Sequence, residues 1–147
     1  MNNTNESMPD ELDRKILELL KKNSRASFAE ISKKIFLSAS SVRERIKRME
    51  DLGLIRAYSV VLDQSLMGNT LEVVIMLKIF SGKFQSAISE INSCPEVMEA
   101  FRITGQHNIH IKVALRDQLH LQSFIDKLLV FGEPTTYLIL SNLKKDL

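Results

Sequence analysis

Hydrophobic residues recur with a helical period through the first third of the chain. One apolar stripe starts just after Pro9 and Asp10, a pair that suits the beginning of a helix. Ser27 and Glu30 have the spacing of a capping box, and a second helical stripe follows them. The two stripes consist of Leu12, Ile16, Leu19 and Leu20, and of Phe28, Ile31 and Ile35. The pattern therefore predicts two short amphipathic helices.

A third helix is predicted over residues 39–52, within the stretch SASSVRERIKRMEDLGLIR. Ser38 suits the N-cap, and Gly53 supplies the left-handed residue at which helices commonly end. The stripe at i, i+4 and i+7 is formed by Val42, Ile46 and Met49. Only about two to four residues around Phe36 separate this helix from the preceding one. Three helices with a tight second turn predict a helix-turn-helix unit, whose third helix enters a DNA major groove.

The charge distribution favours DNA as the partner of this unit. Residues 14–56 carry 12 Lys or Arg against 5 Asp or Glu, whereas residues 63–147 carry 8 against 9. The whole chain has a formal net charge of only +2. A plain solvated helix is the alternative, because Glu44 with Arg48 and Lys47 with Asp51 form i,i+4 pairs that need no partner. The local excess of basic residues nevertheless indicates phosphate contacts in the first sixty residues.

The exposed surface of the third helix has small side chains at its start and long basic side chains further along. Serines at its start let a DNA backbone approach the positive end of the helix, and Arg43 and Lys47 are long enough to reach purine edges. The predicted DNA-binding residues are Arg25, Ser38, Ser40, Ser41, Arg43, Glu44, Arg45, Lys47, Arg48 and Arg56.

Alternating and β-branched residues mark a different second half. Residues 54–63 predict a short strand or wing, and the following segments read strand, helix, strand, strand, helix, strand. This βαββαβ order predicts a ferredoxin-like antiparallel sheet with both helices on one face. The strand at residues 71–80 is apolar on both faces, so we expect a partner subunit to cover the other one. The fold class is α+β, with domains at residues 1–62 and 63–147.

Composition limits the chemistry of the chain. A single cysteine, Cys94, cannot form an internal disulfide, and no Cys/His spacing resembles a metal site. The three histidines have no neighbouring groups that would activate them as catalysts, so neither an enzyme nor a cofactor is expected. The longest apolar run is too short to cross a bilayer and the N-terminus has no apolar signal region, so a cytoplasmic protein is expected.

Nearly the full length of the chain resembles the Lrp/AsnC family, also called feast/famine regulatory proteins. The matching segments are LDRKILELL, NSRASFAEIS, LSASSVRERIKRMEDLGLI, VVLDQSLMG, PEVMEAFRITG and TTYLIL. The resemblance implies a winged helix-turn-helix domain followed by an effector-sensing and oligomerising domain of ferredoxin-like fold. It also implies assembly through the sheets into dimers, often four dimers in an octamer, and an amino acid as the effector.

The family binds its effector at a glycine-containing loop between the second and third strands of this domain. Here the resemblance places that site at Gly105, Gln106, His107 and Asn108, with Thr136 facing it. Asn108 stands where the family usually has an aspartate, the counter-charge for an α-ammonium group, so we expect weak binding of ordinary amino acids. His107 adds donor capacity, and a positive charge below about pH 6.5 that favours an anionic group. A simple polar turn remains the alternative reading of this loop.

Two functions remain open at this point, apart from a metabolic sensor or small enzyme, which the basic first domain disfavours. The first is a sequence-specific transcriptional regulator tuned by a small molecule that resembles an amino acid. The second is an architectural protein that wraps DNA with little sequence preference.

Overall fold

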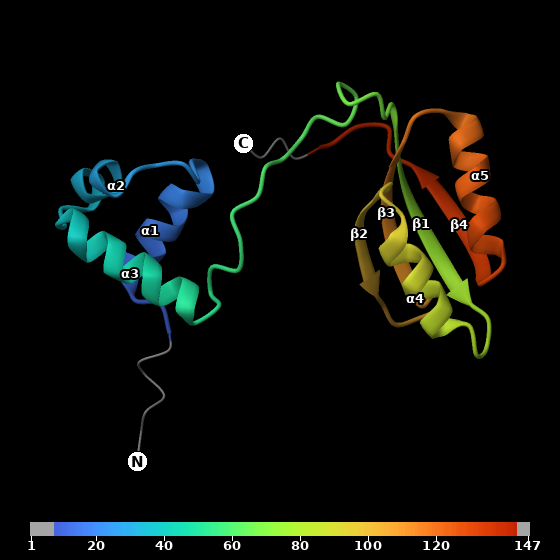
Figure 1. The fold of residues 1–147 in the computed structure, drawn as a ribbon, viewed down its shortest axis with the longest axis horizontal. Helices are drawn as coiled ribbons and strands as arrows, with labels where there is room; N and C mark the ends of the chain where they lie inside the picture. The colour runs from blue at the N-terminus through green and yellow to red at the C-terminus, as the bar shows by residue number, and fades with distance from the viewer. Residues whose placement is uncertain (1–7, 144–147) are drawn as a thin grey trace, which may run out of the picture. The chain divides into compact units, whose positions relative to one another are not determined.

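The structure is a computed structural model that describes residues 8–143 (Figure 1). Contacts between residues divide the chain into two compact units, with the division between Val60 and Val61. None of the helices within residues 8–143 is long and apolar enough to cross a membrane.

The first unit consists of three helices, α1 (Glu11–Lys22), α2 (Phe28–Ile35) and α3 (Ala39–Asp51). Asp10 and Ser27 each cap a helix through a reciprocal capping box, which confirms both predicted starts. Gly53 has a φ of 70°, so the predicted left-handed residue follows the end of α3. The small core of this unit contains Ile16, Leu20, Ile31, Val42, Ile46 and Met49.

Phe28 departs from the expected inward stripe of α2. Its side chain is 42% exposed, whereas Ile31 is 1% exposed and carries most of the burial of this helix. Phe28 is the first residue of α2, and the three-helix core does not extend as far as that end of the helix.

Residues 54–63 form no strand in the structure, so the strand expected there is not found. A strand requires backbone partners, and no described segment of this chain pairs with these residues. Val60 and Val61 are instead 81% and 78% exposed.

The second unit has the predicted βαββαβ order. Its elements are β1 (Leu71–Ile79), α4 (Phe84–Ser93), β2 (Val97–Arg102), β3 (Ile109–Leu115), α5 (Gln118–Leu129) and β4 (Gly132–Leu138). The sheet is antiparallel with strand order β2-β3-β1-β4, and α4 and α5 both lie on one face of it (Figure 1). Ile75, Ile111 and Phe124 are buried between the sheet and these helices. The ferredoxin-like arrangement is therefore confirmed.

Among the described residues of the second unit, no helix lies over the other face of the sheet. The strand register places Phe101, His110, Met76 and Thr135 in one row across all four strands. Phe101 is 52% exposed, and its ring centroid lies 5.9 Å from that of His110. We refer to this surface, with Val74, Lys112 and Tyr137 in the neighbouring row, as the open face.

Gly132, the first residue of β4, lies very close to the backbone of β1. A Cβ atom built at this glycine would lie 2.2 Å from the carbonyl oxygen of Lys78 and 3.0 Å from the Cα atom of Ile79. We expect Gly132→Ala to destabilise the second unit by about 1–3 kcal/mol, because the strands must separate to admit the methyl group. Chemical denaturation of Glu133→Ala, the neighbouring exposed position, provides the matched control, and equal midpoints for the two variants would contradict the prediction.

Candidate nucleic-acid interface and effector loop

The N-terminus of α3 gathers three serine hydroxyls. Ser38 accepts a hydrogen bond from the backbone N–H of Ser41 at 3.1 Å, which confirms its predicted role as the N-cap. The hydroxyl oxygens of Ser40 and Ser41 lie 2.9 and 2.8 Å from that of Ser38. These small side chains leave the positive end of α3 accessible to an anion such as a phosphate.

Arg43, Glu44 and Lys47 project from the exposed side of α3. Within residues 8–143 none of them forms an ion pair, although the sequence offered i,i+4 partners for Glu44 and Lys47. Val42, Ile46 and Met49 hold the opposite side of the helix in the core. Both cations are therefore available for phosphates or purine edges.

Arg45 and Arg48 are held differently, by carboxylates of the α1 N-terminus. Nη1 of Arg45 lies 2.6 Å from Oδ2 of Asp10 and 2.9 Å from Oδ1 of Asp13, and Arg48 donates to the other carboxylate oxygen of Asp13. The side chain of Asp13 is fully buried. These two arginines, predicted as DNA contacts, connect α3 to α1, and we call them with Asp10 and Asp13 the carboxylate–arginine cluster.

Asp10 and Arg45 each favour the charged form of the other. The backbone N–H of Asp13 and the guanidinium of Arg45 lower the pKa of Asp10. Hydrogen bonds to Asp10 and then to Asp13 raise the pKa of Arg45. Each partner thus stabilises the ionised state of the other.

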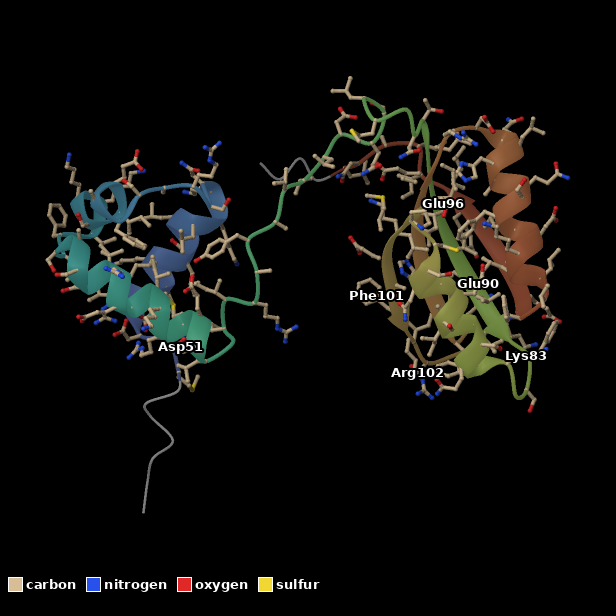
Figure 2. All side chains as sticks on the ribbon, in the orientation of Figure 1. Asp51, Lys83, Glu90, Glu96, Phe101 and Arg102 are labelled. Carbon is tan, nitrogen blue, oxygen red and sulfur yellow. The ribbon has the colours of Figure 1, made fainter. Side chains whose placement is uncertain are left out.

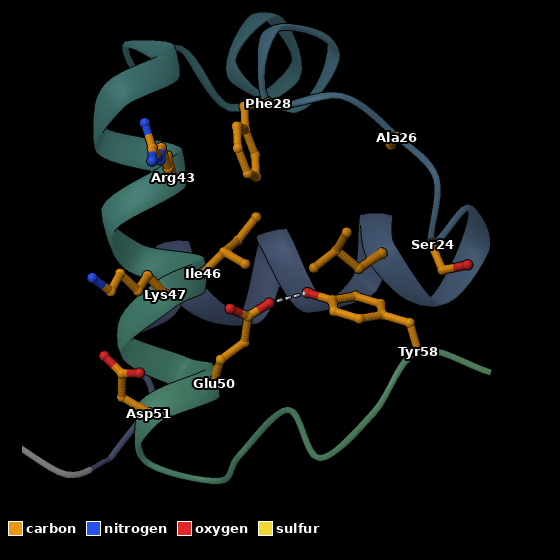
Figure 3. Close-up of a pocket in the computed structure, with 10 residues that line it drawn as sticks. Ser24, Ala26, Phe28, Arg43, Ile46, Lys47, Glu50, Asp51 and Tyr58 are labelled. Carbon is orange, nitrogen blue, oxygen red and sulfur yellow. Dashed lines mark hydrogen bonds between the residues drawn. The ribbon is translucent and has the colours of Figure 1, made fainter.

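A hollow of about 530 Å³ lies beside α3 in the first unit (Figure 3). Phe28 enters it from the start of α2, and Arg43 and Lys47 line its α3 side. The hydroxyl of Tyr58 donates to Oε1 of Glu50 at 2.8 Å, which ties the segment after α3 back onto the helix. Burial and this hydrogen bond raise the pKa of Tyr58 to about 12, so the phenol stays protonated at neutral pH.

The two remaining predicted DNA contacts lie outside the helices. Arg25 is exposed in the turn between α1 and α2, where its backbone N–H donates to Oδ1 of Asn23 at 3.0 Å. Arg56 is exposed in the segment that follows α3. Neither forms an ion pair within residues 8–143.

The loop between β2 and β3 contains the expected residues 105–108 and begins two residues earlier, at Ile103, because β2 ends at Arg102. Gly105 has a φ of 113°, a conformation that residues with a side chain rarely adopt, and Gln106 is exposed. No three His, Cys, Asp or Glu side chains among the described residues converge on a possible metal ion.

Asn108 makes two hydrogen bonds that hold this loop to β1 and a third across the loop itself. Its Oδ1 accepts the backbone N–H of Ile79 at 2.8 Å, its N–H donates to the carbonyl of Leu77, and its carbonyl accepts the N–H of Ile103. The side-chain oxygen expected to face an effector is therefore already bonded to β1. One lone pair of that oxygen and the amide NH₂ group remain for other partners.

The register of β4 places Thr135, rather than Thr136, beside His107. Nε2 of His107 lies 3.4 Å from Oγ1 of Thr135. Thr136 is paired with the buried Ile75, so its side chain lies on the helix-covered side of the sheet. A shift of one residue along a strand reverses the face, and sequence alone did not provide the register.

Sequence reasoning also missed Asp13, the only charged residue that is buried among those described. The signal was present, because Asp13, Ile16 and Leu20 have the i, i+3, i+7 spacing of one helix face. An acidic residue on an inward face requires a cationic partner, and α3 supplies two, Arg45 and Arg48.

Comparisons with known proteins match both units. A family model described as winged helix-turn-helix DNA-binding matches residues 9–56, and one described as Lrp/AsnC ligand binding domain matches residues 72–147. The HTH-type transcriptional regulator LrpB of Bacillus subtilis is 34% identical over 136 residues, which cover 92% of this chain and 91% of that protein.

Solved structures agree with these matches. The structure of B. subtilis LrpC superimposes with a TM-score of 0.90 at 28% identity, over 93% of this chain and 98% of LrpC. The structure of E. coli AsnC gives 0.85 at 28% identity, over 95% and 97% of the two chains.

Proposed function

Because the chain belongs to the Lrp/AsnC family of DNA-binding transcriptional regulators, we propose that it reads a specific DNA sequence and responds to a small molecule. The relatives that match it are transcriptional regulators rather than enzymes. The observation that carries specific reading is the exposed side of α3, where Arg43 and Lys47 have no ion-pair partner within residues 8–143. A bidentate contact from such a side chain discriminates between base pairs.

Binding to one promoter fragment and to random DNA at a single salt concentration tests sequence specificity. A specific regulator binds its site about 10³-fold or more tightly than random DNA. Affinities within a few-fold of each other would favour the alternative, an architectural protein that wraps DNA.

We propose that the open face joins two copies of the chain, with four such dimers in an octamer as the larger assembly. Phe101 and Tyr137 are 52% and 54% exposed, and no described segment covers the sheet on this side. Light scattering at micromolar concentration is expected to show a dimer or larger species. Met76→Glu places a charge in the middle of the face and is expected to shift the distribution toward monomer, whereas Gln122→Glu on exposed α5 is not. A monomeric parent chain would contradict this part of the proposal.

The proposed effector site is the β2–β3 loop with His107 and Asn108, and Thr135 beside it. Asn108 brings no negative charge, so ordinary amino acids are expected to bind weakly. Asn108→Asp keeps an acceptor for the N–H of Ile79 and adds a charge that an α-ammonium group can use. The affinity for an amino acid is therefore expected to rise about fivefold, since hydrogen bonds to charged groups contribute about 1 kcal/mol more than neutral ones.

Calorimetric titration with the twenty amino acids measures this change. Gln122→Glu adds the same charge at a distant exposed site and should leave the affinity unchanged. Tight binding by the parent chain, with no gain in Asn108→Asp, would contradict the assigned role of this residue.

As a DNA-binding regulator the protein is proposed to act in the cytoplasm.

A further inference from the structure

A second possible ligand site lies between helix α4 and the edge strand β2. It is a groove of about 180 Å³, and Figure 2 shows two of its residues, Phe101 and Arg102, on β2 beside α4. The apolar lining comes from Phe84, Ile88, Ile91, Ala100, Phe101 and Ile109. Ile91 and Ile109 are buried at its base, so the floor of the groove belongs to the core of the domain.

Arg102 provides the only charge among the residues that line this groove. Its guanidinium carbon lies 4.5 Å from the centroid of the Phe84 ring, and Arg102 forms no ion pair within residues 8–143. Contact with an aromatic ring restricts a guanidinium group while leaving N–H edges free for a planar bidentate partner such as a carboxylate. The contact with Phe84 favours one orientation of the Arg102 side chain before a ligand arrives, which lowers the entropic cost of binding.

The other lining residues and the volume of the groove indicate the charge and the size of the ligand. Asn92 is the only other polar residue of the groove, and no Asp or Glu lines it, so an ammonium group would find no counter-charge. A dry cavity of about 150 Å³ accommodates benzene, so a volume of this size suits a small branched or aromatic group.

We propose that this groove binds a small monocarboxylic acid with a branched or aromatic apolar tail, with Arg102 on the carboxylate and the tail against Phe84 and Ile88. The ligand class is thus an amino acid without its amino group. This inference rests on the proposed function only in treating the second domain as the ligand-sensing part. The groove is distinct from the loop at residues 105–108, because none of those residues lines it.

Calorimetry of the full chain with 4-methylpentanoate tests the proposal. Saturable binding is expected, with the neutral amide of the same acid about tenfold weaker or more, since the charge-assisted bonds to Arg102 are lost. Leucine is expected to bind this groove more weakly than the acid, because its ammonium group must lose water without a partner.

Three variants locate the site. Arg102→Gln is expected to weaken binding of the acid about tenfold or more. Ala100→Leu, at an exposed position of β2, is expected to fill the groove and abolish binding while Arg102 remains. Lys127→Gln removes an exposed positive charge from α5, outside the groove, and should leave binding unchanged.

Equal affinity for the acid and its amide, stronger binding of leucine that Ala100→Leu abolishes, or unchanged affinity in Arg102→Gln would each overturn the proposal. Because the titrations contain no DNA, they are independent of promoter binding. Promoter binding without acid binding rejects only the groove, and acid binding without promoter binding rejects only the proposed regulatory function.

Discussion

Replacing Asp13 with alanine is expected to lower the free energy of unfolding of the helix-turn-helix domain by about 3–5 kcal/mol. The Asp13 side chain is fully buried and accepts hydrogen bonds from Arg45, Arg48 and the backbone N–H of Asp10. The side chain of Arg45 is only 26% exposed. When Asp13 is removed, the exposed Asp10 is the one carboxylate that still pairs with Arg45. The cost arises mainly from this loss of compensation for a partly buried charge, and not from the net strength of the ion pairs.

Denaturation followed by the helical circular dichroism signal measures this effect. Glu11→Ala removes the exposed carboxylate of the Glu11–Lys15 pair on the same helix and is expected to change the stability little, because solvent screens this pair. Similar losses in Asp13→Ala and Glu11→Ala would show that the carboxylate–arginine cluster does not stabilise the domain.

Acid titration gives a second readout of the same cluster. The pKa of Asp10 is lowered in the folded chain, so its contribution to stability is fully present above its unfolded value of about 3.9 and is lost as pH falls through the folded pKa. Asp10 is exposed, which keeps this contribution small. Asp10→Asn is therefore expected to lower the free energy of unfolding slightly at pH 7, where this contribution is present, and to flatten the loss of stability below about pH 4.

Local sequence rules were sufficient for the helix boundaries. Asp10, Ser27 and Ser38 each accept a hydrogen bond from a backbone N–H three residues later, so the information lies within four consecutive residues. The βαββαβ order also followed from local periodicity, because each segment has the hydrophobic spacing of its own element.

Residue roles that depend on distant partners were not predictable in this way. Arg45 and Arg48 are basic residues of the kind that contact DNA. Only the packing of α1 against α3 shows that they form ion pairs with Asp10 and Asp13. Thr135 and Thr136 are adjacent in sequence, and only the β1–β4 register decides which of them lies beside His107. The expected strand at residues 54–63 required a pairing partner that local periodicity cannot provide.

Arg43→Ala and Lys47→Ala are each expected to weaken binding to a specific DNA site by about 1–3 kcal/mol, or about 5- to 150-fold. Both side chains are exposed on α3 without an ion-pair partner in the described part of the chain, so truncation removes a contact with DNA and breaks none within the protein. Thermal stability and assembly state should therefore remain those of the parent chain. The discrimination between the promoter site and random DNA should fall in parallel, because contacts to base edges carry specificity.

A control variant distinguishes the loss of a contact at a particular position on α3 from a general loss of positive charge. Lys21→Ala with Lys22→Ala removes two positive charges from the end of α1, in the same domain. That double variant is expected to weaken binding to promoter and random DNA by similar factors, with a shallower dependence on salt. If Arg43→Ala and Lys47→Ala also weakened both DNAs equally, these residues would contact only phosphates and the specificity would lie elsewhere. Unchanged affinity in both single variants would instead show that α3 does not read the DNA through this face.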